Sequence, residues 1–117
     1  MKTLFTLLFV LLAALPSAVD ATSGEVSVGE QLPNAPMQGL TGGSVFISQY
    51  FGKPLIINVW ASYCGPCLAE MGSLERLFQR YGDRFNVIGI SIDDYRERAE
   101  VFLAKADTTF PHFIDRQ

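Results

Sequence analysis

The chain alternates between continuous apolar runs and segments in which apolar residues recur at helical spacing. Residues 54–60, PLIINVW, form a nearly unbroken apolar run rich in β-branched and aromatic side chains. Such a run predicts a buried strand in a sheet that is covered on both faces. After it, apolar residues recur every three or four positions, at Leu68, Met71, Leu74, Leu77 or Phe78, and Tyr81. This spacing predicts a helix over residues 64–80 with one apolar side.

Further elements are predicted on either side of this strand and helix. Residues 41–44 contain two glycines and predict a turn before a short strand at 45–47, as in a hairpin. A second helix is predicted after Asp94, because Asp94 and Glu97 have the spacing of a capping box and one apolar face follows: Tyr95, Ala99, Phe102, Leu103 and Ala106. Residues 110–115 predict the next strand. The order strand, helix, strand, helix, strand predicts an α/β fold with a mostly parallel central sheet flanked by helices.

The N-terminal residues have the pattern of a secretory signal. Lys2 precedes an apolar run over residues 4–15, and residues 16–21 are mostly small. We predict a signal peptide over residues 1–21, cleaved after Ala21, and one domain over residues 22–117. A membrane span needs about 20 apolar residues, so the short run favours cleavage, with an uncleaved membrane anchor as the alternative.

Composition adds one exclusion. The chain of 117 residues has 9 basic and 12 acidic side chains, a net charge of −3. A nucleic-acid-binding domain is expected to carry a clustered excess of positive charge. We therefore expect no nucleic-acid partner.

The only two cysteines, Cys64 and Cys67, lie where the strand pattern gives way to the helical one. At a helix start, free backbone N–H groups and the positive end of the helix dipole favour a thiolate over a thiol. In such Cys-x-x-Cys settings the pKa of a cysteine falls from about 8.5 to roughly 3.5–7.5. We predict that Cys64 is a nucleophile and that Cys67 resolves the mixed disulfide it forms. Pro66 suits a helix start, and Gly65 allows a partner chain to approach closely.

The same cysteine spacing occurs in half of a zinc site and in structural disulfides. Zinc would need two more ligands, but the chain has no third cysteine and its single histidine, His112, is distant in sequence. The strand-then-helix setting favours a redox dithiol. An oxidant or isomerase using the same atoms, and a non-catalytic metal-binding module or inactive fragment, stay open. His112 is predicted to be a strand residue with a solvent or backbone partner and not a catalytic base.

Residues 52–71, GKPLIINVWASYCGPCLAEM, resemble the active-site region of thioredoxin-like proteins, most closely the exported TlpA/ResA/CcmG group of thiol:disulfide oxidoreductases. The resemblance covers nearly the whole chain after residue 25, including segments 28–36, 87–93 and 110–115. It implies a thioredoxin-like fold and a periplasmic reductase of protein disulfides that needs no cofactor. It also implies exported disulfide-containing substrates, apocytochrome c among them, and a membrane electron donor that restores the dithiol, with association at the inner membrane as a further expectation.

The resemblance also implies roles for residues beside the cysteines. Tyr63 lies where the group often carries an exposed aromatic residue, and Gly65 and Pro66 complete the motif. We expect these three and Trp60 to form a docking surface for a substrate chain. For Trp60, packing in the core is the alternative.

Several positions depart from the pattern of the resembling proteins. Asn58 stands where thioredoxins proper carry a buried aspartate that accepts a proton from the second cysteine. Glu70 is therefore our candidate proton shuttle, with a solvated helix carboxylate as the alternative. Gly72 replaces a proline that kinks the helix, and Ala61 replaces the threonine of peroxidatic sites, which disfavours peroxidase chemistry.

The last departure concerns the C-terminal part. The sequence reaches Gln117 before the cis-proline loop, the two antiparallel strands and the last helix that thioredoxin-like folds place after this point. We expect a domain that is incomplete at its C-terminus, either as a fragment of a longer product or as a natural truncation.

Overall fold

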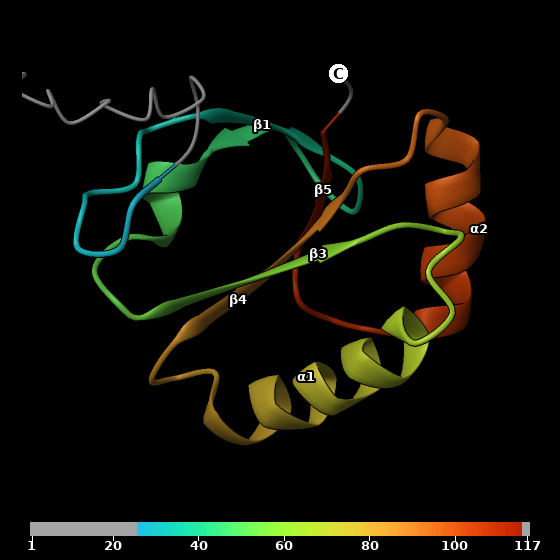
Figure 1. The fold of residues 1–117 in the computed structure, drawn as a ribbon. Coiled ribbons are helices and arrows are strands. Elements are labelled where there is room, and N and C mark those ends of the chain that lie inside the picture. Colours follow the sequence, from blue (N-terminus) through green and yellow to red (C-terminus); the bar gives the residue numbers. More distant parts are fainter. Residues whose placement is uncertain (1–25, 116–117) are drawn as a thin grey trace, which may run out of the picture. The chain divides into compact units, whose positions relative to one another are not determined.

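The computed structural model describes residues 26–115, so the predicted signal peptide at 1–21 lies outside the described residues (Figure 1). The chain divides into two units between Leu32 and Pro33. In the described part of the first unit, the Glu30 N–H donates to the Ser27 carbonyl and closes a turn. Among residues 26–115, no helix has the length and apolar character that crossing a membrane requires.

The second unit is built on one five-stranded sheet in the order β2-β1-β5-β4-β3. The strands are β1 Pro36–Gly39, β2 Val45–Phe46, β3 Leu55–Trp60, β4 Asn86–Ser91 and β5 His112–Ile114. β3, β4 and β5 run parallel, as predicted, whereas β1 is antiparallel to both β2 and β5. The sheet is therefore mixed, with the predicted hairpin at its β1–β2 side.

Two α-helices supply the crossovers between the parallel strands. α1 spans Cys67–Tyr81 and joins β3 to β4, and α2 spans Arg96–Ala106 and joins β4 to β5. A 3-10 helix, η1, covers Ile47–Tyr50. α1 runs unbroken past Gly72. The helices follow the βαβ order predicted from the sequence (Figure 1).

Both helix starts differ from the prediction. α1 begins at Cys67 and not at residue 64, because Cys64 belongs to the preceding turn. α2 is preceded by Tyr95, which makes no side-chain cap hydrogen bond, so the predicted Asp94–Glu97 capping box is wrong. The apolar period locates the buried side of a helix, but it does not fix the first turn.

The environment of β3 also differs from the prediction. Its run of apolar residues predicted a strand covered on both faces, yet β3 is the edge of the described sheet and Val59 is 56% exposed. Strand propensity reflects the fit of β-branched side chains to a pleated surface. It does not report how many neighbouring strands or layers cover that surface.

The main core cluster lies between the sheet and the two helices, and it joins Leu40, Trp60, Cys67, Met71, Ala99, Phe102 and Ile114. The indole of Trp60 stacks on the ring of Phe102 from α2, with 5.3 Å between ring centroids. Cys67 is 3% exposed in this cluster. The second cysteine is therefore built into the core, and the first packs against its border.

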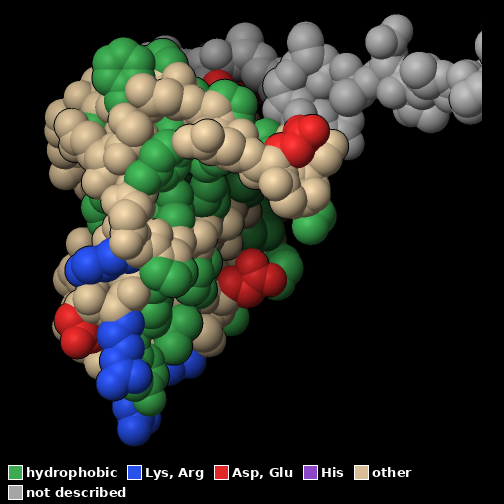
Figure 2. Space-filling view, turned by 90° about the vertical axis from the view of Figure 1, so that its left-hand side faces the viewer, with side chains coloured by type: hydrophobic (Ala, Val, Ile, Leu, Met, Phe, Trp, Pro, Cys, Tyr) green, Lys and Arg blue, Asp and Glu red, His purple; other side chains and the backbone are tan. Residues whose placement is uncertain are grey.

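The surface is mixed in character. On the face drawn in Figure 2, hydrophobic side chains lie among polar ones, and the Lys and Arg side chains gather toward its lower end. The guanidinium groups of Arg80 and Arg84 lie 5.3 and 5.8 Å from the centroid of the Tyr81 ring. These two positive charges therefore make cation–π contacts with one aromatic side chain.

Candidate active site

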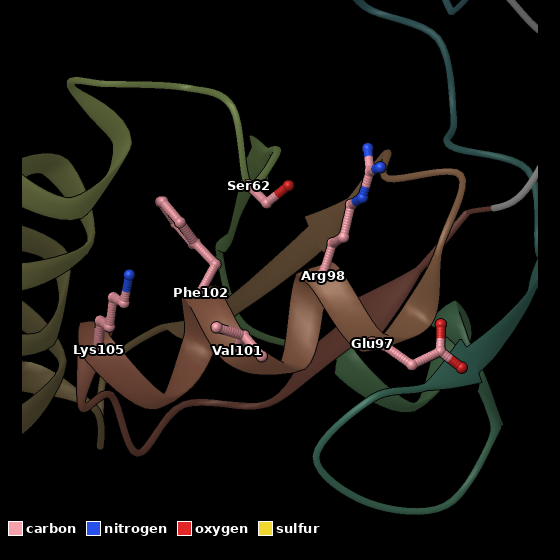
Figure 3. Close-up of a pocket in the computed structure, with 6 residues that line it drawn as sticks. All are labelled: Ser62, Glu97, Arg98, Val101, Phe102 and Lys105. Atoms are coloured by element: carbon pink, nitrogen blue, oxygen red, sulfur yellow. The ribbon is translucent and has the colours of Figure 1, made fainter.

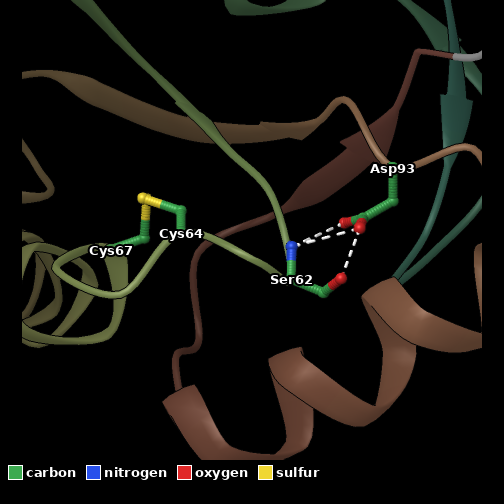
Figure 4. Close-up of a disulfide and its surroundings, with 4 residues drawn as sticks. All are labelled: Ser62, Cys64, Cys67 and Asp93. Carbon is green, nitrogen blue, oxygen red and sulfur yellow. Dashed lines mark hydrogen bonds between the residues drawn. A yellow bond between two sulfur atoms is a disulfide. The ribbon is translucent and has the colours of Figure 1, made fainter.

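The two cysteines form a disulfide in a turn that leads from β3 into α1 (Figure 4). Their Cα atoms are 5.4 Å apart, which lies within the usual range for a disulfide. The Cys64 N–H donates to the Ala61 carbonyl at 3.0 Å, and the Cys67 N–H donates to the Cys64 carbonyl at 3.3 Å. Cys64 is half-buried, whereas Cys67 is almost fully buried. An incoming thiol or disulfide therefore reaches Cys64 first.

The surroundings of Cys64 are open to a partner chain. Tyr63 is 75% exposed, and Gly65 and Pro66 are exposed as well. Trp60 is different, because it is only 1% exposed. The expectation that Trp60 contacts a substrate is therefore wrong for this structure, and its alternative of core packing describes what it does.

A buried carboxylate lies beside the same turn. Asp93, just after β4, accepts hydrogen bonds from the Ser62 N–H at 2.9 and 3.1 Å and from the Ser62 hydroxyl at 2.5 Å. The Ser91 hydroxyl also donates to it, at 2.7 Å. Burial opposes the charged form, but the hydrogen bonds from Ser62 and Ser91 outweigh it and hold the pKa of Asp93 below its ordinary value. Asp93 is thus an anion tied to the residue two positions before Cys64.

His112 lies in the core and contacts Trp60. The Trp60 ring N–H donates to Nδ1 of His112 at 3.1 Å, so the neutral ring carries its proton on Nε2, which is 2.8 Å from the Thr108 hydroxyl. Burial lowers the pKa of His112 to about 4, and the charge of Glu75 opposes this shift. The predicted solvent or backbone partner for the ring is wrong, because its partners are two side chains.

The sequence did not predict Asp93 as part of the site, nor the contact between His112 and Trp60 in the core behind it. Asp93 pairs with a serine 31 residues away, and His112 with a tryptophan 52 residues away. One signal was present for each: His112 is a titratable residue inside an apolar strand segment, and Asp93 is a charged residue that directly follows one. Such a residue needs a buried partner, but the sequence does not say which one.

Comparisons with known proteins agree with this geometry. The sequence profile of the AhpC/TSA family matches residues 28–117. The chain belongs to the AhpC/TSA family. Its fold is thioredoxin-like, as predicted.

Relatives of this AhpC/TSA chain include a thioredoxin-like protein and thiol-disulfide oxidoreductases. It is 30% identical over 95 residues to the thioredoxin-like protein YneN of Bacillus subtilis, covering 79% of this chain and 56% of YneN. It is 30% identical to the thiol-disulfide oxidoreductase ResA of Geobacillus thermodenitrificans, covering 100% of this chain and 69% of ResA. A solved thiol-disulfide oxidoreductase from Bacteroides fragilis superposes with a TM-score of 0.62 at 28% identity, over 71% of this chain and 64% of that one. The chain thus spans a little over half of YneN and about two thirds of ResA.

The AhpC/TSA chain has one pocket at the first turn of α1 and another beside Ser62. One, of about 450 Å³, is lined by Asn58 and Glu70 together with Ala69, Ser73 and Leu74. Glu70 is exposed in the first turn of α1, so its role as proton shuttle stays a prediction. The buried side-chain nitrogen of Asn58 has no hydrogen-bond partner among the described residues.

The second pocket, of about 380 Å³, lies between Ser62 and α2 (Figure 3). Val101 and Phe102 supply its apolar lining, and its charged lining residues are Glu97, Arg98 and Lys105. Figure 3 shows these side chains rising from one helix beside the turn that carries Ser62.

The packing around the Trp60–His112 pair gives a test in this AhpC/TSA fold. A methyl group at Gly89 of β4 would lie 2.9 Å from the Trp60 ring nitrogen and closer still to the His112 ring. We expect Gly89→Ala to lower the free energy of unfolding by about 2 kcal/mol, measured by urea denaturation.

The matched control for Gly89→Ala is Gly72→Ala in α1. There the new methyl group meets its nearest atom at 3.7 Å, an ordinary contact. Alanine favours the helix by roughly 0.5–1 kcal/mol, so Gly72→Ala is expected to stabilise the protein. Equal stability of Gly89→Ala and wild type would contradict the close approach described for β4.

Proposed function

We propose that this protein is a thiol:disulfide oxidoreductase that reduces disulfides of other proteins through Cys64 and Cys67. The observation that carries the proposal is the asymmetry of the pair, an accessible Cys64 joined to a buried Cys67 at the first residue of α1. The names of ResA and of the Bacteroides fragilis protein support it. A metal-binding module has less support, because residues 26–115 contain no cluster of three or more His, Cys, Asp or Glu side chains.

The proposed reaction proceeds in two exchanges. The Cys64 thiolate attacks one sulfur of a substrate disulfide, forms a mixed disulfide and releases the first substrate thiolate, which takes up a proton. The Cys67 thiol then loses its proton and attacks the Cys64 sulfur, which releases the second substrate thiolate. The substrate disulfide gains two electrons, and the protein ends with the Cys64–Cys67 disulfide seen in the structure.

Several residues around the pair are assigned roles in this proposal. Tyr63, Gly65 and Pro66 form the exposed rim that receives the substrate chain. Glu70, one turn after Cys67, accepts the proton that Cys67 loses. Cys67 is the first residue of α1, and the positive end of the helix dipole there favours the thiolate.

We further propose that the protein works in the periplasm. The signal-like pattern of residues 1–21 supports export, followed by a thioredoxin-like domain over residues 22–117 that is either released or anchored at the inner membrane. In an oxidising compartment a dithiol tends to form its disulfide, so a reductant there needs a membrane electron donor. Exported proteins with disulfides are the proposed substrates, with apocytochrome c and thus cytochrome c maturation as one case.

The test is a turnover assay for insulin disulfide reduction with dithiothreitol as the electron source. We expect the protein to accelerate precipitation of the insulin B chain well above the rate with dithiothreitol alone. The matched control is the same protein after reduction and alkylation of both cysteines, which is expected to give only the background rate. Equal rates with native and alkylated protein would reject the proposal.

A further inference from the structure

The turn that carries Cys64 is fixed to the rest of the protein at two places. On one side, the disulfide and the Cys67 N–H tie Cys64 to the start of α1. On the other, Ser62 is tied to Asp93 by three hydrogen bonds, two from its N–H and one from its hydroxyl. The Cys64 N–H also bonds to the Ala61 carbonyl and closes the turn over residues 61–64 that connects Ser62 to Cys64.

Asp93 is well placed to act as the fixed point of this arrangement. It is 1% exposed, and both its side chain and its backbone N–H bond to the Ser91 hydroxyl at the end of β4. The Trp60 carbonyl also accepts a hydrogen bond from the Ile92 N–H at 3.0 Å, which continues the β3–β4 ladder to the site. Figure 4 shows Asp93 and Ser62 on one side of the turn and the disulfide on the other.

Reduction weakens one of these two attachments. When the bond between the sulfurs breaks, Cys64 loses its side-chain link to α1 and keeps the hydrogen bond from the Cys67 N–H to its carbonyl. The hydrogen bonds between Ser62 and Asp93 do not involve the sulfurs. The rate at which two groups on one chain react depends on their effective concentration, which falls as the segment between them gains freedom. Whatever holds Ser62 in place therefore keeps the two thiols close after reduction.

We propose that Asp93 and Ser62 form a clamp that holds Cys64 beside Cys67 in the reduced protein and thereby sets how readily the disulfide closes. Asp93 is a positioning residue here, since it acts on the sulfurs through Ser62 and the turn. One consequence rests on the proposed function: in a looser turn, Cys67 attacks the mixed disulfide more slowly, so turnover is slower. The effect on the equilibrium between dithiol and disulfide does not rest on that function, because it concerns only the two thiols of this chain.

The test is the equilibrium of the protein with glutathione. Two glutathione thiols are oxidised to one glutathione disulfide while the Cys64–Cys67 disulfide gains two electrons and two protons, so the equilibrium constant reports the effective concentration of the dithiol. The fractions of oxidised and reduced protein are counted by alkylation and mass measurement. The variants are Asp93→Ala, Asp93→Asn and Ser62→Ala. Asn86→Ala is the control, because it removes one hydrogen bond, to the Tyr50 carbonyl, at the opposite end of β4.

We expect Asp93→Ala to shift the equilibrium about tenfold toward the dithiol and Ser62→Ala to shift it at least about threefold the same way. Asp93→Asn keeps an oxygen that accepts the Ser62 N–H, so it is expected to stay within about threefold of wild type. Asn86→Ala is expected to lower stability with no shift of the equilibrium beyond about twofold.

Ser62→Ala carries the test if Asp93→Ala does not fold. Wild-type equilibrium in Ser62→Ala, or an equal shift in Asn86→Ala, would overturn the clamp. A shift in Asp93→Asn as large as that expected for Asp93→Ala would also overturn it. The charge of Asp93, and not its hydrogen bonds that hold Ser62 in place, would then control the equilibrium. Failure of insulin reduction by wild type would reject the proposed function and would leave this equilibrium test intact.

Discussion

Cys64→Ser is expected to lower the rate of insulin disulfide reduction at least about a thousandfold, because a serine hydroxyl stays protonated and cannot attack a disulfide. Cys67 cannot replace the lost nucleophile, because it lies in the core cluster and is only 3% exposed. The rate is measured with dithiothreitol as the electron source, as for wild type. Substantial turnover by Cys64→Ser would show that attack starts elsewhere.

Cys67→Ser is the matched variant, and it is expected to fail at a different step. Cys64 keeps its position and forms the mixed disulfide, but no second sulfur releases the substrate. The covalent complex with an insulin chain or with glutathione should therefore accumulate and be visible by mass under non-reducing conditions. A Cys67→Ser protein that formed no such adduct, next to a Cys64→Ser protein that did, would reverse the assigned roles.

The second large effect concerns pH and stability. Burial lowers the pKa of His112 to about 4, whereas an unfolded histidine titrates near 6.5. Between these values the unfolded chain binds a proton that the folded chain does not, so folding loses free energy as the pH falls. We expect the free energy of unfolding to fall by about 2 kcal/mol from pH 6.5 to 5 and by about 3 kcal/mol by pH 4, measured by urea denaturation.

The control is His112→Phe, which fills a similar space and does not titrate. Its stability at neutral pH will be lower, because the Trp60 ring N–H loses its partner. The free energy of unfolding of His112→Phe is expected to change little between pH 6.5 and 5. Asp93 and Glu75 do not contribute a slope there, because hydrogen bonds lower their pKa values against the effect of burial and their stabilising contribution is lost only at lower pH. The same slope in wild type and His112→Phe would contradict the assignment.

The local features of the site could be predicted from the sequence, and its long-range contacts could not. The cysteine pair and the strand-to-helix change around it depend on residues within one short segment, so spacing and propensity suffice to find them. The partner of Ser62 follows β4 and the partner of Trp60 lies in β5, and their hydrogen bonds span 31 and 52 residues. Only the register of the parallel strands brings these groups together.

The start of α1 also shows which features the sequence predicts and which it does not. The apolar stripe from Leu68 onward gave the direction in which α1 packs, but the conformation of residues 64–66 decides where the helix starts. Pro66 has helical backbone angles, with φ −73° and ψ −12°, and its carbonyl accepts the Glu70 N–H, so the helical hydrogen bonds begin at Pro66 and not at Cys64. Cys64 thus lies near the positive end of α1 without being part of it, which spacing alone could not distinguish.

The position of Trp60 gives the protein an optical reporter. It is the single tryptophan of the chain, and its indole lies in the same core cluster as Cys67 while donating a hydrogen bond to His112. Emission from one ring therefore senses both neighbours, so fluorescence can follow the opening of the sulfur bond and the protonation of the imidazole without any label.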